Sequence, residues 1–498
     1  MSVERVQEML SMGNLSKAQT YLDEFSEDQH FEKNLYHSLI LICKGDYQRA
    51  GDLAVEAQDI AKLTQDNIKH ACGHVVLAYS LLKLGKLDEA KYYIAKTEEK
   101  LANYSMDDDL DIGYWFRYLY QIKGSIHARF GEINESLASF EKCLEITLQL
   151  GQKGLLPGIY NNIGYSYNLV GQSTTAYEYF LKSLEVAEEL DNNFLMYYPL
   201  SNLGNYYYGQ GDIENATKYH TRALNLAIII DNKANIASQY RDMSQIYRFK
   251  GEFEESLNYL QKSLELRNEI GNPIWSVFTL IYLVEICTDL NRFDLAMAYS
   301  DQIKEICKLN KNNKLIDQIY RMADGLICKA KPRLKSKSEA MKIFREIIEE
   351  EMVDYDNTVN AILHLCDLLL FEIKLTNESE VLLEIHTLTA KLIQMAEANN
   401  SHTLIGEILG LQAGIAIIED NFSHALNLYD KALQLAKTHK SLTLEKKIKQ
   451  LRENFINESE NWRTLHEKNN GIIQKIEKSN VESYLKEIIK LKDNLFQK

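Results

Sequence analysis

The chain has 498 residues, of which 45% are hydrophobic and 26% charged, and its formal net charge is −15. This length exceeds what one hydrophobic core can organise, so several domains or an elongated array are expected. The acidic balance argues against nucleic acid as the main ligand, because affinity for a phosphate backbone depends on clustered Lys and Arg. The chain has only four prolines, which favours long helices with little irregular structure.

The seven cysteines are scattered, odd in number and without CxxC spacing, so they indicate neither a disulfide framework nor a zinc ribbon. Cys143 falls at a small-residue helix position, where a buried, inert thiol is expected. We therefore expect a reducing compartment, the cytoplasm. The longest apolar run, 362–373, is broken by His364, Asp367 and Glu372, and so predicts a buried helix rather than a membrane span.

Paired helices are predicted from the start of the chain, in an N-terminal segment of residues 1–109. An Ala follows a Gly after five residues at three places: Gly13 with Ala18, Gly45 with Ala50, and Gly85 with Ala90. The polar insertion 104–110 predicts a longer loop, whose Asp residues can cap the next helix.

The central segment, residues 110–310, repeats one short phrase every 40 residues, at Gly131, Gly171, Gly211, Gly251 and Asn291. A fixed period in this range is typical of a stack of identical helix pairs. In the second of these units, the spacing predicts a first helix over 159–170. Gly171 is expected to end that helix in a left-handed turn, which glycine adopts without steric cost.

The second helix of each central unit carries small residues at two places. Helices that pack about 8–10 Å apart leave no room for a branched side chain at their crossing. The small pairs are Ser136 and Cys143, Ala176 and Ser183, Ala216 and Ala223, and Ser256 and Ser263.

The register loosens after Asn291, and residues 311–400 predict degenerate helix pairs, with helices near 354–374 and 378–399. The basic, proline-bearing stretch 331–337 predicts either a joint or a longer loop inside one array. Residues 401–440 form a clear last unit, with Ala425 in its usual place.

The C-terminal segment, 441–498, carries an apolar helical stripe at Leu444, Ile448, Leu451 and Phe455, followed by a last helix over 481–496. Repeat arrays need a terminal element that is apolar inside and polar outside, so we expect capping helices. The alternative is a coiled-coil dimerisation arm, for which only two clean heptads are present.

The central phrases carry a family resemblance. Asn162-Ile-Gly-Tyr-Ser-Tyr with Gly171 and Ala176, and its counterpart starting at Asn202, resemble the tetratricopeptide repeat. The 40-residue form is similar to repeats in kinesin light chains and in the spindle-polarity adaptor. The chain also resembles the body of the peptide-sensing Rap regulators of bacteria, and its tail resembles the ends of archaeal repeat proteins.

This resemblance implies an all-α fold, a right-handed α-solenoid of antiparallel helix pairs with a helical C-terminal cap. In the family, first helices line the concave side and second helices form the outer wall. Transferring the register gives these candidate peptide-binding residues: Gln121, Arg129, Asn161, Asn162, Tyr165, Asn168, Tyr198, Asn202, Asn205, Tyr208, Arg241, Asp242, Gln245 and Arg248.

The chemistry of this set suits an extended peptide. Amides pair with a peptide backbone, tyrosines supply stiff contact area, and arginines hold carboxylates at two points. The alternative is that Asn162 and Asn202 only connect neighbouring helices and that Tyr165 fills space. The family's Asn is missing at Ile122 and Tyr282, so the amide ladder should cover only the central units.

No catalytic or phosphate-binding motif is present, and the His and Cys residues lack metal-ligand spacing, so no enzyme activity, metal or cofactor is predicted. We expect a non-catalytic scaffold or adaptor that binds a protein or peptide partner, as a monomer or weak dimer. The alternative is a regulatory sensor whose superhelix changes shape on binding a peptide. An enzyme subunit is the third hypothesis, and nothing in the sequence supports it.

Overall fold

The computed structural model describes residues 3–64, 66–104, 110–130, 132–169, 172–311, 313–350, 352–398, 401–439, 441–458, 462 and 471–495. Every regular element in these ranges is a helix, and consecutive helices pack as antiparallel pairs. The predicted all-α solenoid is therefore confirmed. Within each pair, we call the odd-numbered helix the first helix and the even-numbered one the second helix.

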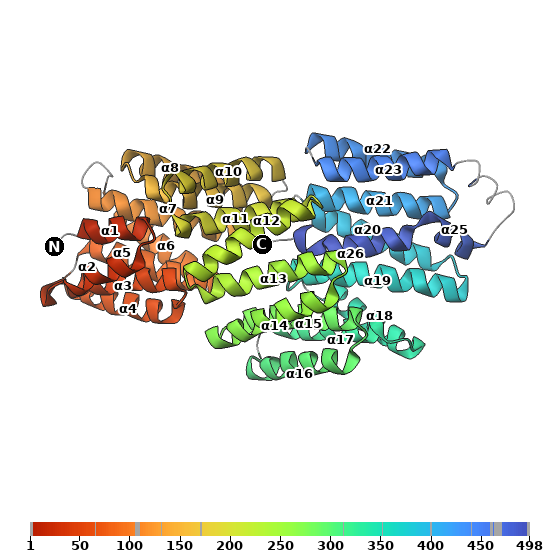
Figure 1. Ribbon diagram of the computed structural model, residues 1–498, viewed down its shortest axis with the longest axis horizontal. Helices are drawn as coiled ribbons and strands as arrows, with labels where there is room; N and C mark the ends of the chain where they lie inside the picture. The colour runs from red at the N-terminus through yellow and green to blue at the C-terminus, as the bar shows by residue number, and fades with distance from the viewer. Residues whose placement is uncertain are drawn as a thin grey trace. The chain divides into compact units, whose positions relative to one another are not determined.

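The chain divides into two compact units, and the helices are labelled in Figure 1. Unit 1 comprises residues 1–203 and 225–232. Its helices are α1 (Val3–Ser11), α2 (Leu15–Asp23), η1 (Glu27–Gln29), α3 (His30–Lys44), α4 (Tyr47–Thr64), α5 (Asn67–Lys83), α6 (Leu87–Leu101), α7 (Leu110–Phe130), α8 (Ile133–Gln149), η2 (Lys153–Leu155), α9 (Leu156–Leu169) and α10 (Ser173–Glu189).

Unit 2 comprises residues 204–224 and 233–497. Two helices, α11 (Asn193–Gly209) and α12 (Ile213–Ile229), have residues in both units. The others are α13 (Lys233–Lys250), α14 (Phe253–Ile270), α15 (Pro273–Asp289), α16 (Phe293–Leu309), α17 (Lys314–Ala330), α18 (Leu334–Glu349), α19 (Tyr355–Thr376), α20 (Val381–Ala398), α21 (His402–Ile418), α22 (Phe422–Thr438), α23 (Leu442–Asn457), α25 (Ile472–Ser479) and α26 (Val481–Leu495).

The turn inside each pair has the expected backbone. Gly211 and Gly251 follow α11 and α13 with φ of 72° and 80°, the left-handed region in which glycine is not strained. Asn291 occupies the same place with φ of 56°. The turns at Gly131 and Gly171, and the Asp residues of 107–109 that were expected to cap a helix, lie outside the described residues.

The small residues of the second helices lie at the helix crossings, and one contact recurs from pair to pair. The Ser183 hydroxyl donates to the Pro157 carbonyl oxygen, and the Ser263 hydroxyl donates to that of Ala237, both at 2.7 Å. In the corresponding contact, Cys143 Sγ lies 3.5 Å from the carbonyl oxygen of Arg117. The repeat in sequence is therefore a repeat in packing.

First helices also carry a glycine where an aromatic ring of the second helix lies against the backbone. A Cβ at Gly164 would lie 2.7 Å from the ring of Phe180 and 3.0 Å from the carbonyl oxygen of Ala176. Phe180 is buried, so its ring cannot move outward without opening the pair. Close approach, rather than flexibility, requires glycine at this position.

The basic connector is shorter than predicted. Only Lys331 to Arg333 separate α17 from α18, and Leu334 already begins the next helix. Residues on both sides of the connector, including Ile327 and Phe344, belong to one hydrophobic cluster. The stretch 331–337 is therefore neither a long loop nor a joint between packed segments, because continuous core packing spans it.

The C-terminal helices pack on their own chain. Leu444, Ile448 and Phe455 of α23 are buried in a cluster with α22. Helix α26 contacts both α19 and α21, two first helices, and Figure 1 shows it alongside them. Its residues Leu485 and Ile488 are fully buried there. The apolar stripes of these helices are buried within their own chain, whereas a coiled-coil arm would need them to contact a second chain.

Candidate functional site

In unit 1, several predicted groove residues lie on first helices and remain accessible. Tyr198 is 49% exposed, and Arg129 is also exposed. Asn162, Tyr165 and Asn168 of α9 are half-buried. A partner that approaches the first-helix face of unit 1 can therefore reach these five side chains.

The amides of neighbouring first helices bond to each other. Asn202 Nδ2 of α11 donates to Asn161 Oδ1 of α9 at 2.8 Å, and Asn161 is buried. In this contact the amides connect neighbouring helices, which is the alternative interpretation of the amide ladder. The side-chain oxygen of Asn161 is already used in the free chain.

Gln121 is bonded to a buried arginine. Its Oε1 accepts from Arg117 Nη1 at 2.7 Å, within α7. Arg117 is only 1% exposed, and its Nε and Nη2 have no hydrogen-bond partner in the described part of the chain. The guanidinium lies 3.7 Å from the centroid of the Tyr118 ring. Buried guanidinium groups normally pair with a carboxylate, so this arrangement is unusual.

In unit 2, the predicted arginines are paired with acids of the same unit. Arg248 contacts Glu285 Oε2 at 2.5 Å and Asp289 Oδ2 at 2.9 Å, both from the next first helix. Arg241 contacts its neighbour Asp242 at 2.7 Å. These ion pairs already use the charge with which the arginines could hold a ligand's carboxylate.

The other predicted residues of unit 2 are mostly enclosed. Tyr208 and Gln245 are buried, and the Tyr208 hydroxyl donates to the Gln245 backbone oxygen at 3.3 Å. Asn205 is half-buried on α11. The accessible first-helix residues of the prediction therefore lie mainly in unit 1.

Sequence reasoning missed four residues that lie near Tyr198 and Arg129. Tyr79 lies six residues before Gly85, as Tyr165 lies six before Gly171, so extending the register to the early units would have found it. We define the tyrosine–cation face by its six residues, which come from α4, α5, α7 and α11: Tyr47, Tyr79, Lys83, Tyr118, Arg129 and Tyr198.

Ring and cation contacts join three residues of this face. The ring centroids of Tyr79 and Tyr118 are 6.4 Å apart, and Lys83 Nζ lies 5.5 Å from the Tyr79 centroid. Burial raises the pKa of Tyr79, and the nearby phenols of Tyr47 and Tyr198 raise it further. Tyr79, Tyr118 and Lys83 therefore contact one another in series, and Tyr47, Tyr198 and Arg129 lie within electrostatic range of them, although Tyr47 and Tyr198 are far apart in sequence.

Lys83 is exposed to solvent, yet the surrounding protein perturbs its charge. Desolvation lowers its pKa to about 8, and Arg129 lowers it further. Burial raises the pKa of the neighbouring Cys43 thiol to about 11, so this thiol is protonated and unreactive at neutral pH.

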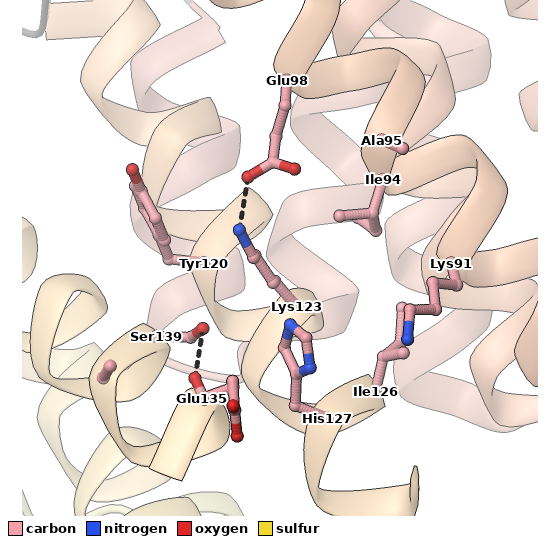
Figure 2. A pocket seen from close by; sticks show the side chains of 11 residues that line it. Lys91, Ile94, Ala95, Glu98, Tyr120, Lys123, Ile126, His127, Glu135 and Ser139 are labelled. Atoms are coloured by element: carbon pink, nitrogen blue, oxygen red, sulfur yellow. Dashed lines mark hydrogen bonds and ion pairs between the residues drawn. The ribbon is translucent and has the colours of Figure 1, made fainter. Parts of the chain in front are cut away.

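A cavity lies between α6, α7 and α8 and has a volume of about 510 Å³ (Figure 2). Its apolar lining includes Ile94 and Ile126, and most of its charged groups are paired. Lys123 Nζ contacts Glu98 Oε1 at 2.5 Å, and the dashed line in Figure 2 marks this contact. Because opposite charges neutralise each other there, the cavity offers little attraction to a charged ligand.

Within the described ranges, no group of three or more His, Cys, Asp or Glu side chains could hold a metal ion. The described helices also include none that is long and apolar enough to cross a membrane. All seven cysteines are free, and Cys143 is buried as predicted, with a pKa that burial raises to about 11.

The likeness to one solved structure, RapI, supports the helical-repeat fold. The apo form of RapI is 13% identical, with a TM-score of 0.50, over 72% of this chain and 98% of RapI. The quorum sensor NprR from B. thuringiensis is 14% identical, with a TM-score of 0.46, over 82% and 99%. Aspartyl phosphate phosphatase F from Bacillus subtilis is 15% identical, with a TM-score of 0.44, over 70% and 93%.

No curated protein matches the sequence. Residues 118–149 match the model of the tetratricopeptide repeat. Residues 158–442, more than half of the chain, match the model of the MalT-like TPR region. The chain therefore belongs to the family of MalT-like tetratricopeptide repeat proteins.

Proposed function

We propose that the chain is a non-catalytic scaffold that binds an extended peptide segment of a partner protein on the first-helix face of unit 1. The observation that carries this proposal is the accessibility of Asn162, Tyr165 and Tyr198, which lie on first helices whose other faces form the core. Accessible tyrosines and amides supply contact area and backbone hydrogen bonds for such a segment. The free thiols fit a reducing compartment, for which we propose the cytoplasm.

The test is affinity capture from the native cell with the full chain, followed by mass spectrometry. We expect Tyr198→Ala to lose the partners that the unchanged chain retains. Tyr92→Ala is the matched control, because Tyr92 is 57% exposed on a second helix. Each of these tyrosines also has an edge-on neighbour: Tyr197 lies 4.9 Å from Tyr198, and Tyr93 lies 5.3 Å from Tyr92. Equal capture by both variants would exclude this face.

A ligand-responsive sensor is the second candidate, and one contact favours it. Within unit 1, Asn192 Nδ2 donates to the Met12 carbonyl oxygen at 2.5 Å, so the turn after α1 meets the start of α11. A ligand that changes the curvature of the intervening repeats has to break this contact. Small-angle scattering with and without the captured peptide separates the candidates, because a sensor changes its dimensions and a rigid scaffold does not.

A further inference from the structure

Lys83 and Arg129 form no ion pair in the part of the chain that the structure describes, although lysines on neighbouring helices do. Lys91, for example, contacts Glu132 at 3.2 Å. The groups that perturb Lys83 electrostatically are Arg129 and Cys43, and neither is a carboxylate.

A third cation lies beside this face. The buried Arg117 guanidinium stacks on Tyr118 and has two nitrogens without hydrogen-bond partners in the described residues. Cations at close range repel one another, and desolvation increases the cost. The rest of the chain has more than enough acids to neutralise them, since its net charge is −15. Cations that have no paired acid among the described residues are the pattern of a surface that receives an anion.

The phenols of the face add hydrogen-bond donors. Burial raises the pKa of Tyr79, so its hydroxyl keeps its proton at neutral pH. A carboxylate accepts hydrogen bonds from ammonium, guanidinium and phenol groups, and such charge-assisted bonds are about twice as strong as neutral ones. Extended peptides can present carboxylates on Asp or Glu side chains at intervals that span several first helices.

We propose that the tyrosine–cation face binds an extended acidic segment of a partner protein through its Asp or Glu carboxylates. This inference rests on the proposed function and adds the chemical class of the partner. Lys83 and Arg129 contact the carboxylates, the tyrosines contact the peptide between them, and Arg117 contributes positive potential from below the surface.

The experiment measures binding of labelled synthetic peptides to the full chain by fluorescence anisotropy. The peptides alternate Ala with Glu, Gln or Lys and share one length. We expect the Ala–Glu peptide to bind at least about tenfold more tightly than the Ala–Gln peptide, with an affinity that falls as salt is added. Lys83→Met and Arg129→Met should each weaken its binding by about tenfold, the scale of one charge-assisted contact.

Lys182→Met is the matched control. Lys182 is exposed on the second helix α10 and lies 4.8 Å from the ring centroid of Tyr179, so it shares the cation–aromatic contact of Lys83 but not its position. Its removal should leave peptide binding unchanged. Lys83→Arg preserves the charge and should retain binding, which distinguishes loss of charge from misfolding.

The pH dependence gives an independent readout. Because the pKa of Lys83 is lowered to about 8, its ammonium loses its proton within an accessible range. Affinity for the Ala–Glu peptide should fall from about pH 7 to about pH 9, and Lys83→Arg should remove most of that fall because arginine stays charged.

Four results would overturn the inference. The first is tighter binding of the Ala–Gln or Ala–Lys peptide, and the second is unchanged binding by Lys83→Met and Arg129→Met. Both would leave the proposed scaffold function standing. The third is binding of a single-stranded oligonucleotide more tightly than the Ala–Glu peptide, which would make nucleic acid the ligand of this face. Failure of all three peptides would also overturn it, and the capture experiment with Tyr198→Ala then decides the proposed function separately.

Discussion

Replacing Gly164 with Ala tests the closest contact inside a helix pair of unit 1. In an exposed helix, Gly→Ala stabilises the folded state by about 0.5–1 kcal/mol, because alanine loses less backbone entropy on folding. Here the new Cβ would lie 2.7 Å from the Phe180 ring and 3.0 Å from the Ala176 carbonyl oxygen. Overpacking of a close-packed site costs about 1–3 kcal/mol. The steric cost exceeds the gain, so we expect a net destabilisation of about 1–2 kcal/mol.

The same helix provides the control. Gly158 is exposed on α9 and has no atom within 4 Å of an added Cβ, so Gly158→Ala should be neutral or stabilising. Urea unfolding followed by circular dichroism measures both free energies. In a Phe180→Leu background the penalty at Gly164 should shrink, because the smaller side chain removes the contact with the ring and leaves only that with the Ala176 carbonyl oxygen. Equal effects of Gly164→Ala and Gly158→Ala would refute the packing argument.

Three further predictions concern buried polar groups. The Tyr484 hydroxyl donates to Glu407 Oε2 at 2.6 Å, so Tyr484→Phe should lower the free energy of unfolding by about 1.5–3 kcal/mol, and an unchanged urea midpoint would contradict this. Burial lowers the pKa of His220 below its ordinary 6.5, so the unfolded state takes up a proton first and stability should fall as the pH drops below that value. His220→Phe should flatten this acid sensitivity in thermal melts at a series of pH values. Asn202→Ala removes the donor to buried Asn161 and should cost about 1–2 kcal/mol in urea unfolding, whereas a change of peptide affinity without loss of stability would indicate a direct binding role.

The periodic spacing of the sequence was sufficient to predict the helix pairs, their turns and their close contacts. Gly211 and Gly251 end first helices in left-handed turns, and Ser183 and Ser263 lie at helix crossings, as the register predicted. These features are local, because turn conformation and pair packing depend on residues within one repeat. The prediction of a joint or a longer loop at 331–337 was wrong, because the basic residues beyond Arg333 are helical.

Contacts between repeats were not accessible from the sequence. Spacing placed Arg248 on a first-helix face, but only the tertiary structure showed that Glu285 and Asp289 neutralise it. Likewise, only the fold places Tyr198 near Tyr47, which belongs to a much earlier repeat. The physical reason is that such contacts depend on the accumulated rotation from one helix pair to the next. The sequence by itself determined the repeating unit, and the tertiary structure decided which side chains of different units meet.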